Sequence, residues 1–450
     1  MNGEGVCKVN NEVIFVPFAL PDETVEGIII NNKNKFSIGK VTNIVNASKF
    51  RAEPKCPYFK KCGGCALQHY EYEKQLEFKT NLVQDTLKKV GNITTNVKPC
   101  VASNLQYNYR NKASFPVVKE DGETKIGMFR VGSHNLVELN YCPLQQSKIN
   151  KLLMLTKEFV NKFKISGFNE KNNSGILKHL VARELNNSLI VTLVTTTRKF
   201  PHLDEFVNIL KQNFESVGLN LNINNLNNNV ILSNEYVHVF GISELSCYDN
   251  EIKYQVSSAS FYQVNNFIKD LIYKKVLNNI EQNSVVIDAY SGAGLLSSMI
   301  SKKCNTVYGI EIVKQATENA NNLKRANNIT NLININGDCA EKLPILVNKI
   351  KENCNNLTIV LDPPRKGCDK KVLDAIKKVK PNKIIYVSCS PISLARDLNI
   401  LMETETSLIN NNLNISSESP YVIKEVEPYD MFPQTPNVET VVILEKKDAN

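Results

Sequence analysis

The sequence predicts an α/β protein whose C-terminal part forms a doubly wound, Rossmann-like parallel sheet. Three observations predict this fold class. From about residue 256, short β-branched runs alternate with helix-like segments, as in successive βαβ units. A glycine-rich turn follows the first run, and acidic residues mark the ends of four successive runs. The chain before this part is less regular, and we divide the protein into residues 1–52, 53–255 and 256–450.

Residues 1–52 are predicted to form a small β-barrel, because turn residues separate short apolar runs. The runs are Val13–Phe18, Thr24–Ile30 and Lys40–Ile44. Small barrels of the OB type bind nucleic acid through basic and aromatic surface residues. The segment is therefore either an RNA-binding barrel or a plain accessory barrel.

Three cysteines follow within ten residues, at Cys56, Cys62 and Cys65, with Gly63-Gly64 between the last two. Such spacing is typical of a metal site, since the glycines allow both thiolates to face one centre. Soft thiolates suit zinc or an iron–sulfur cluster. The fourth ligand is missing locally, and Cys100 and Cys142 are the candidates.

The rest of residues 53–255 is predicted to be a mixed α/β domain. Glu71–Val90 has the apolar periodicity of an amphipathic helix, with Gly91 placed to end it. This helix packs either on its sequence neighbours or on the C-terminal domain. Short strands are predicted at Ala113–Val118, Ile126–Arg130, Leu189–Thr195, Val230–Leu232 and Tyr236–Phe240. The basic and aromatic run Tyr107–Lys112 is either an RNA contact or an ordinary polar surface.

Residues 256–450 alternate strands with helices, with Ala289–Gly294 as the glycine turn after the first strand. The predicted helices run from this turn to Lys302, from Gln315 to Asn327 and over Asp369–Val379, and a linker precedes the last two strands. The predicted strands are Ser284–Asp288, Thr306–Ile312, Leu332–Asn336, Leu357–Leu361, Lys383–Val387, Tyr421–Pro428 and Val441–Glu445.

Acidic residues mark the ends of the first four of these strands: Asp288, Glu311, Asp338 and Asp362. Any one of them alone is more simply a helix cap or a surface charge. Together they fit the class I S-adenosylmethionine fold better than a nicotinamide fold, whose pyrophosphate needs the helix N-terminus. An acid before the glycine turn suits a cationic donor that has an amino-acid tail.

A thiol reaches the same edge of the sheet at Cys389, directly after the Lys383–Val387 strand and Ser388. Cysteine is either a small buried hydrophobic residue here or a nucleophile. C5 of uracil becomes nucleophilic only after a thiolate adds to C6, and a base must later remove the C5 proton. Arg365 stands where enzymes that methylate amino groups of bases carry an aromatic residue after Asp362-Pro-Pro. The pattern therefore favours methylation of a pyrimidine carbon.

The composition agrees with an intracellular protein that binds a nucleic acid. The net charge of +9 leans toward a polyanion. No signal-peptide pattern and no apolar run near the roughly 20 residues of a membrane helix are present. Twelve cysteines in a non-secreted chain are more often ligands or catalysts than disulfides. We expect a cytoplasmic monomer without a membrane segment.

Taken together, the motifs resemble the RumA/TrmA family of RNA uracil-5 methyltransferases over nearly the whole chain. Residues 3–27 also resemble a TRAM domain, a small RNA-binding barrel. This barrel and the cysteine triplet are similar to the branch that acts on 23S ribosomal RNA. The matching motifs are Cys56-x5-Cys62-Gly-Gly-Cys65, Phe261-Tyr-Gln-Val-Asn265, Asp288-Ala-Tyr-Ser-Gly-Ala-Gly294, Asp362-Pro-Pro-Arg-Lys-Gly367, Val387-Ser-Cys389, Leu394-Ala-Arg-Asp397, and Asp430-Met-Phe-Pro-Gln-Thr435 with Val438-Glu439.

The resemblance implies a role for each candidate residue. Cys389 matches the nucleophile and Glu439 the base that removes the C5 proton. The positions that match donor-binding residues are Gln263, Tyr290, Glu311 and Asp362. The positions that match ligands of a [4Fe–4S] cluster are Cys56, Cys62, Cys65 and Cys142.

The chain departs from the family pattern at three places. Ser390 stands where asparagine usually follows the nucleophile, and Asn437 stands where histidine is expected before Val438-Glu439. Lys178-His179 replaces an Arg-His pair near Arg183. Two other functions stay open: the same chemistry on tRNA, or RNA binding by an iron–sulfur protein with a non-catalytic methyltransferase fold.

Overall fold

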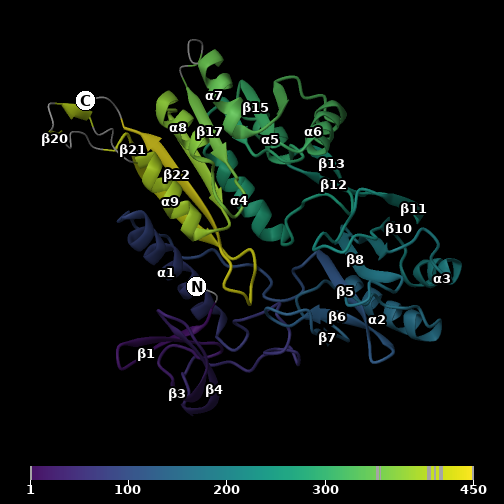
Figure 1. Ribbon diagram of the computed structural model, residues 1–450. Coiled ribbons are helices and arrows are strands. Elements are labelled where there is room, and N and C mark those ends of the chain that lie inside the picture. Colours follow the sequence, from purple (N-terminus) through teal and green to yellow (C-terminus); the bar gives the residue numbers. More distant parts are fainter. Residues whose placement is uncertain are drawn as a thin grey trace.

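The protein folds into three parts around three separate β-sheets, as seen in a computed structural model (Figure 1). The structure describes residues 3–350, 354, 356–402, 407–409, 412–414 and 419–447. Figure 1 shows the N-terminal strands at the bottom, the central part on one side and the C-terminal sheet above them. The active-site candidates all belong to this C-terminal sheet and to segments that meet its lower edge.

The N-terminal part is a barrel-like, four-stranded sheet with the order β1-β2-β4-β3. Its strands are β1 (Gly5–Val9), β2 (Glu12–Val16), β3 (Thr24–Asn32) and β4 (Ser37–Asn46). The three predicted strands correspond to β2, β3 and β4, whereas β1 was not predicted. Arg51 ties this sheet to the following segment, since its guanidinium pairs with Glu23 and Nη2 donates to the Phe18 carbonyl at 2.9 Å.

The central part is a seven-stranded sheet with the order β11-β10-β9-β8-β5-β6-β7. Two helices pack against it, α2 (Ser147–Lys162) and α3 (Leu203–Asn213). Its strands are β5 (Lys112–Glu120), β6 (Glu123–Phe129), β7 (Leu136–Glu138), β8 (Leu177–Leu185), β9 (Ser188–Thr195), β10 (Val217–Ile223) and β11 (Tyr236–Gly241).

The strand predicted at Val230–Leu232 is wrong. Asn224 Nδ2 donates to the Val230 and Ile231 carbonyls at 2.7 and 3.0 Å. Asn228 Oδ1 accepts from the Val230 N–H at 3.0 Å. Asparagine side chains thus occupy backbone groups that a strand would need for pairing, and the segment stays a loop.

The C-terminal sheet has the order β16-β15-β14-β17-β18-β22-β21, and β22 alone runs antiparallel to its neighbours in this sheet. In order of the sequence this is 3-2-1-4-5-7-6, a doubly wound sheet with a switch point between β14 and β17. Its strands are β14 (Val285–Ala289), β15 (Thr306–Glu311), β16 (Leu332–Asn336), β17 (Leu357–Leu361), β18 (Lys383–Ser388), β21 (Tyr421–Tyr429) and β22 (Glu439–Lys446). The seven strands lie within about one or two residues of their predicted positions, so the Rossmann-like fold class is confirmed.

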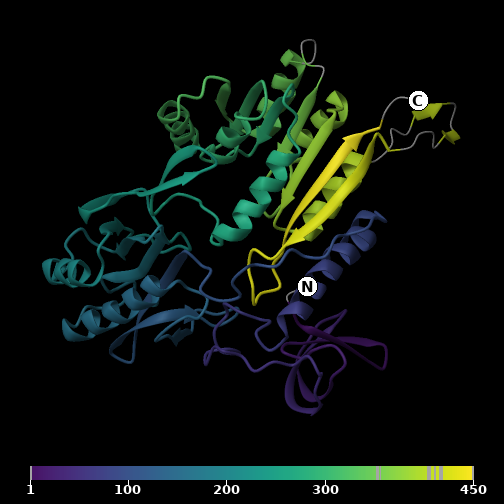
Figure 2. The ribbon, with the colours of Figure 1, turned by 180° about the vertical axis from the view of Figure 1, so that it is seen from behind.

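Helices cover this sheet on both faces (Figure 2). They are α4 (Asn266–Asn278), α5 (Leu295–Ile300), α6 (Lys314–Ala326), α7 (Cys339–Ile350), α8 (Lys370–Val379) and α9 (Pro391–Met402). Part of the predicted linker after β18 is α9, a helix that the periodicity analysis missed. Two small hairpins complete the described chain: β12 (Leu245–Asp249) with β13 (Ile252–Val256), and β19 (Ser407–Ile409) with β20 (Asn412–Asn414).

Helix α1 (Tyr72–Gly91) packs on the C-terminal domain, against α9. Val83 and Leu87 share a hydrophobic core with Leu398 of α9 and with the sheet. The helix ends at Gly91, one residue later than predicted, and Asn92 rather than Gly91 takes the left-handed cap position, with φ 52°. A side chain on Gly91 would come within 2.8 Å of the Ala395 carbonyl oxygen, so glycine permits the close approach of the two helices.

Along the described residues, none of the helices is both long and apolar enough to span a bilayer.

Candidate active site

The nucleophile and base candidates meet at one edge of the C-terminal sheet. Cys389 directly follows β18, and Glu439 is the first residue of β22. Ser388 pairs with Thr440 in the antiparallel register of these strands, which places the next residues, Cys389 and Glu439, opposite each other. Asp362 follows β17, the strand on the other side of β18, and reaches the same edge.

Burial raises the pKa of all three groups, and repulsion by neighbouring carboxylates adds to the effect on Cys389 and Glu439. Burial, then the charges of Glu439 and Asp362, raise the pKa of the Cys389 thiol to about 11. Burial and the Asp362 charge raise the pKa of Glu439 to about 8, and its side chain is buried. Desolvation raises the pKa of the Asp362 carboxyl to about 7, although the residue as a whole is partly exposed. A nearby positive charge is therefore needed to favour the Cys389 thiolate and the Glu439 carboxylate.

Arg365 supplies that charge. Its guanidinium is near enough to lower the pKa of Cys389 and the pKa of Glu439, although burial outweighs it in both cases. Arg365 is exposed, and its carbonyl accepts from Ser393 Oγ at 3.0 Å, which fixes the Asp362-Pro-Pro-Arg turn against α9. In the sequence, Arg365 argued only against methylation of amino groups. The tertiary structure shows that its charge acts on both Cys389 and Glu439.

The donor-binding candidates surround the glycine turn after β14. Both oxygens of Glu311 accept backbone N–H groups, from Gly292 at 2.9 Å and from Val313 at 2.7 Å. These bonds hold the carboxylate at the end of β15 and close the turn over it. Gly294 has φ 78°, and a Cβ there would lie 2.6 Å from Ala320 Cβ, so the turn needs glycine for its close contact with α6.

Asp288 lies beneath this turn and is almost fully buried. It accepts a hydrogen bond from Ser297 of α5. Burial, together with the charges of Asp362 and Glu311, raises the pKa of Asp288 to about 7. Asp338, the fourth acid in the series, instead caps α7, because its Oδ1 accepts from the Ala340 N–H at 2.9 Å.

Tyr290 and Gln263 approach the edge from two directions. Tyr290, two residues after Asp288, has φ 69°, a left-handed conformation that is strained for a tyrosine and is often found at functional sites. Gln263 precedes α4 and is held from the central domain by Asn111. Asn111 Nδ2 donates to the Gln263 carbonyl at 2.9 Å, and the Asn111 N–H donates to the Val264 carbonyl at 3.0 Å.

Four cysteines line one cavity between the N-terminal segment and the central sheet, with a volume of about 270 Å³. They are Cys56, Cys62, Cys65 and Cys142. Burial raises the pKa of each thiol, to about 12 for Cys65 and about 11 for Cys142. Cys100, the other candidate for the fourth ligand, lies in the core beneath α1 instead.

Within the described part of the chain, no three His, Cys, Asp or Glu side chains lie close enough to hold one metal ion. A single zinc ion binds its four sulfurs at about 2.3 Å, which brings them into mutual contact. In a four-iron cluster each thiolate binds a different iron, so the sulfurs stand further apart around a larger group. The four cysteines share one cavity without being gathered, among the described residues, around a single metal-ion position.

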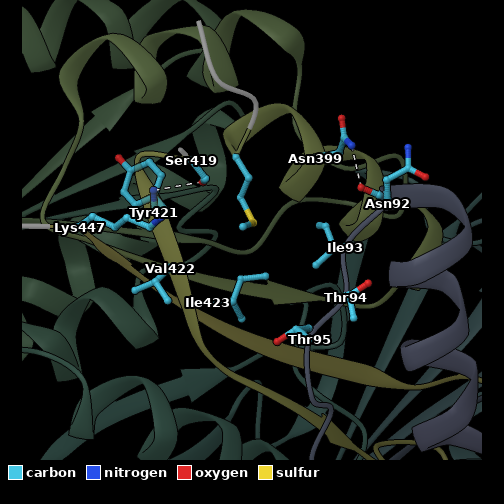
Figure 3. A pocket seen from close by; sticks show the side chains of 12 residues that line it. Asn92, Ile93, Thr94, Thr95, Asn399, Ser419, Tyr421, Val422, Ile423 and Lys447 are labelled. Atoms are coloured by element: carbon cyan, nitrogen blue, oxygen red, sulfur yellow. Dashed lines mark hydrogen bonds between the residues drawn. The ribbon is translucent and has the colours of Figure 1, made fainter. Parts of the chain in front are cut away.

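A larger cavity, of about 480 Å³, lies at the opposite end of the C-terminal sheet. Figure 3 shows Tyr421 and Ile423 of β21 on one wall and Ile93 and Thr95 on the other. Asn399 donates to the Gly91 carbonyl at 2.7 Å at its rim. None of the predicted site residues lines this cavity.

The departures from the family pattern have local explanations. Ser390 precedes α9, and its Oγ faces the Ser393 N–H at 3.5 Å, as in the N-cap position that serine and asparagine both favour. Asn437 is exposed in the loop before β22. Lys178 Nζ donates to the Leu226 carbonyl at 2.7 Å and lies over the Phe168 ring. Burial lowers the pKa of its neighbour His179 to about 4.

Other buried residues of the site were not singled out from the sequence. Asp397 accepts from the Cys368 N–H at 2.7 Å and from Tyr386 Oη at 2.6 Å, so it fixes the end of the Asp362–Gly367 turn. Arg183 Nη2 donates to the Ser260 carbonyl at 2.7 Å, just before the Phe261–Asn265 segment. β8 also carries Lys178, His179 and Glu184, so Arg183 did not stand out in the sequence.

Comparison with known proteins gives one consistent result. Residues 71–447 match the family model described as tRNA (uracil-5-)-methyltransferase. Proteins described as uncharacterized RNA methyltransferases are similar over nearly their whole length. The relative from Clostridium tetani is 38% identical over 98% of this chain and 93% of its own, and that from Clostridium acetobutylicum is 37% identical over 99% and 95%.

Among solved structures, the Pyrococcus abyssi tRNA (uracil-54, C5)-methyltransferase in complex with S-adenosyl-L-homocysteine is similar to this chain. It is 25% identical, with a TM-score of 0.74, and the likeness covers 99% of both chains.

Proposed function

The chain belongs to the tRNA (uracil-5-)-methyltransferase family, and we propose that it methylates C5 of a uridine in 23S ribosomal RNA. The observation that carries the proposal is the meeting of Cys389 and Glu439 at one edge of a doubly wound sheet. S-adenosylmethionine would supply an electrophilic methyl group there. We assign its binding to Gln263, Tyr290, Glu311 and Asp362, which surround the glycine turn and the neighbouring strand end.

The proposed reaction uses each group once. The Cys389 thiolate adds to C6 of the flipped uracil, which makes C5 nucleophilic toward the methyl group. Glu439 then takes the C5 proton, and the electrons of the C5–H bond form the C5=C6 bond as the thiolate leaves. Arg365 favours both ionised groups, because its charge lowers the pKa of Cys389 and the pKa of Glu439.

The test of this function is covalent trapping. RNA that contains 5-fluorouridine should give an adduct that survives SDS, since fluorine at C5 cannot leave as a proton. Cys389→Ala should give no adduct. Absence of trapping by the wild-type protein would favour the alternative of an RNA-binding protein with a non-catalytic methyltransferase fold. Equal trapping by Cys389→Ala would exclude Cys389 as the nucleophile.

Two observations bear on the RNA substrate. The N-terminal barrel and the cysteine triplet lie before residue 71, outside the part that matches the tRNA-named family. We propose ribosomal RNA as the substrate because the barrel and the triplet resemble the branch that acts on it. The Pyrococcus neighbour, named for a tRNA position, covers 99% of this chain and makes tRNA the second candidate. Methylation of 23S rRNA and tRNA transcripts with labelled donor, followed by mapping of the methylated uridine, decides between them.

We assign a [4Fe–4S] cluster to the cavity lined by Cys56, Cys62, Cys65 and Cys142. The support is the chemistry and spacing of the four thiols. Their raised pKa values mean that binding must release protons, as thiolate ligation requires. Nothing in the reaction above depends on this cluster.

The surface beside the cysteines suits RNA. Lys55 lies over the Tyr107 ring at 4.9 Å, and Lys60 lies over Phe18 at 6.0 Å. Basic groups against aromatic faces suit both phosphates and unstacked bases. We propose that this surface binds the substrate, in a cytoplasmic monomer. Charge reversal at Lys55 and Lys60 together should weaken RNA binding and reduce its salt dependence.

A further inference from the structure

The loop that joins β21 to Glu439, residues 430–438, is anchored from outside its own domain. Figure 1 and Figure 2 show it as the yellow loop that leaves the lower end of β22 and reaches toward α1. Asp430, at its start, is fully buried with Lys79 of α1, and the two form an ion pair. Tyr72 Oη donates to the second Asp430 oxygen at 2.8 Å.

The middle of the loop is held by a pair of buried glutamines. Gln75 of α1 is 1% exposed and Gln434 is 2% exposed. Gln75 Nε2 lies 3.0 Å from Gln434 Oε1, and Gln75 Oε1 accepts from the Gln434 N–H at 3.1 Å. The same Nε2 also lies within hydrogen-bond distance of the Leu67 and Tyr70 carbonyls.

The Gln434 carbonyl is held from a third direction. The Ala66 and Leu67 N–H groups donate to it at 3.1 and 3.0 Å, directly after Cys65. Tyr109 Oη donates to the Pro433 carbonyl at 3.1 Å. Gln434 itself has φ 71°, a conformation that a non-glycine residue keeps only where its surroundings enforce it.

These contacts hold the 430–438 loop more firmly than is needed to connect β21 to β22. Pairing with β18 already places the β22 backbone, so a loop of nine residues needs no anchor to close. Buried hydrogen bonds from α1 and from the residues after Cys65 instead set the path by which the chain enters Glu439. A small displacement of Glu439 has a large effect, because proton transfer requires the base within hydrogen-bond reach of the proton.

We propose that Gln75 is a positioning residue for Glu439, acting through Gln434 and the 430–438 loop, and that it controls removal of the C5 proton rather than methyl transfer. This inference rests on the proposed function. It follows that the segment after Cys65 and helix α1 are parts of the active-site framework, although neither reaches the nucleophile.

Displacement of Glu439 has a chemical consequence that distinguishes a positioning role of Gln75 from a general role in stability. Before proton removal, Cys389 is joined to C6 and the new methyl group to C5. If Glu439 is displaced, the C5–H bond does not break, the C6–S bond stays, and a methylated RNA–protein adduct accumulates on ordinary uridine. A general loss of stability would instead reduce methyl transfer and adduct formation together.

The test compares Gln75→Met with Gln84→Met. Methionine preserves the shape of the glutamine side chain and removes its hydrogen bonds. Gln84 lies on the same helix and bonds only to the 95–97 segment, through the Thr95 carbonyl at 2.7 Å and the Val97 N–H at 3.1 Å. Both variants are made in the full-length protein, with labelled S-adenosylmethionine and uridine-containing substrate RNA.

Gln75→Met should transfer the first methyl group within about twofold of the wild-type rate, yet lose about tenfold or more in steady-state turnover, consistent with the usual weight of a general base. It should also accumulate a labelled adduct that survives SDS, whereas Gln84→Met should not. If Gln75→Met does not fold, Gln434→Leu, which removes the partner Oε1, carries the same expectation.

Proportional loss of the first methyl transfer and of turnover in Gln75→Met would overturn the inference, as would adduct accumulation in Gln84→Met. Failure of the proposed function has a different appearance. In that case the wild-type protein would neither methylate the RNA nor be trapped by 5-fluorouridine.

Discussion

Cys389 and Glu439 flank the last pair of the β18–β22 ladder, Ser388 with Thr440, and the charge of Glu439 acts on the Cys389 thiol, although fifty residues separate the two in the sequence. The antiparallel pairing of β18 with β22 brings the base to the side of the nucleophile. A parallel final strand would have placed its first residue at the opposite edge of the sheet. The single antiparallel strand in this sheet is therefore the feature that completes the site.

Substitution of the two residues should separate the steps of the reaction. Cys389→Ala should remove all methylation and all trapping. Glu439→Gln should transfer one methyl group per protein and then stop, with turnover reduced about 10²–10⁴-fold, the usual contribution of a general base. Gel analysis of labelled adducts on unmodified RNA checks this. A Glu439→Gln protein that turns over normally would exclude Glu439 as the base.

The reaction should accelerate with rising pH. Both Cys389 and Glu439 act in the deprotonated form, and the pKa of each is raised, to about 11 and about 8. Arg365→Ala removes the charge that lowers both pKa values, so the rate profile should move to higher pH, with about a tenfold loss at neutral pH for each pKa unit. The measurement is the single-turnover rate between pH 6 and pH 10.

Lys366→Ala is the matched control, because Lys366 is the next residue and its side chain is also exposed. It should leave the profile in place. A shift equal to that of Arg365→Ala would mean that general surface charge, and not the position of Arg365, sets the two pKa values.

Asp288 should make the ligand-free protein less stable at high pH. Its pKa is raised by burial to about 7, above the value of about 3.9 in an unfolded chain, so the folded state binds more protons between these values. Stability therefore falls as pH rises from about 4 to about 7. At pH 8 Asp288→Asn should be about 1–3 kcal/mol more stable than the wild type, and near pH 4 the difference should vanish.

Urea unfolding at the two pH values measures this effect. Asp338→Asn provides the control, since Asp338 is an exposed helix cap that asparagine can replace. Equal stabilisation by both variants would mean that net charge, and not burial of Asp288, is responsible.

The cysteine cavity should hold iron. Anaerobic reconstitution should give a brown protein with visible absorption and about four irons per chain, as expected for a [4Fe–4S] cluster. Cys142→Ser should lose most of the iron, whereas Cys100→Ser should keep it, because Cys100 lies in the core beneath α1. A colourless protein with one equivalent of zinc would contradict the cluster assignment.

Much of the fold could be predicted because the C-terminal strands are buried on both faces. Such strands are continuous apolar runs, as in Leu357–Leu361, and continuous runs are visible in the sequence. Strands β8 and β10 were missed for the opposite reason. Arg183 and Glu184 in β8 and Asn220 and Asn222 in β10 are polar residues that neighbouring segments bury, so the strands lack an apolar pattern.

The candidate site likewise contains features that were visible in the sequence and features that were missed. The acid and the thiol at the strand ends were visible because each follows an apolar run directly. Helix α9 was not, since Pro391–Met402 begins immediately after the nucleophile and its buried face mixes Leu394 and Leu398 with Ser393 and Asp397. The resemblance had already named Cys142 rather than Cys100 as the fourth cysteine, and in the structure Cys142 lines the cavity with the triplet whereas Cys100 does not.

The sequence by itself determined the class of the fold, the position of the glycine turn, the nucleophile candidate and the cysteine-rich segment that was predicted to bind a metal. All of these depend on residues close together in the chain. Only the tertiary structure decided that Glu439 stands beside Cys389, that Arg365 acts on both, and that α1 and the residues after Cys65 hold the loop leading to the base. These relationships join segments up to several hundred residues apart, and local periodicity carries no record of which distant surfaces will meet.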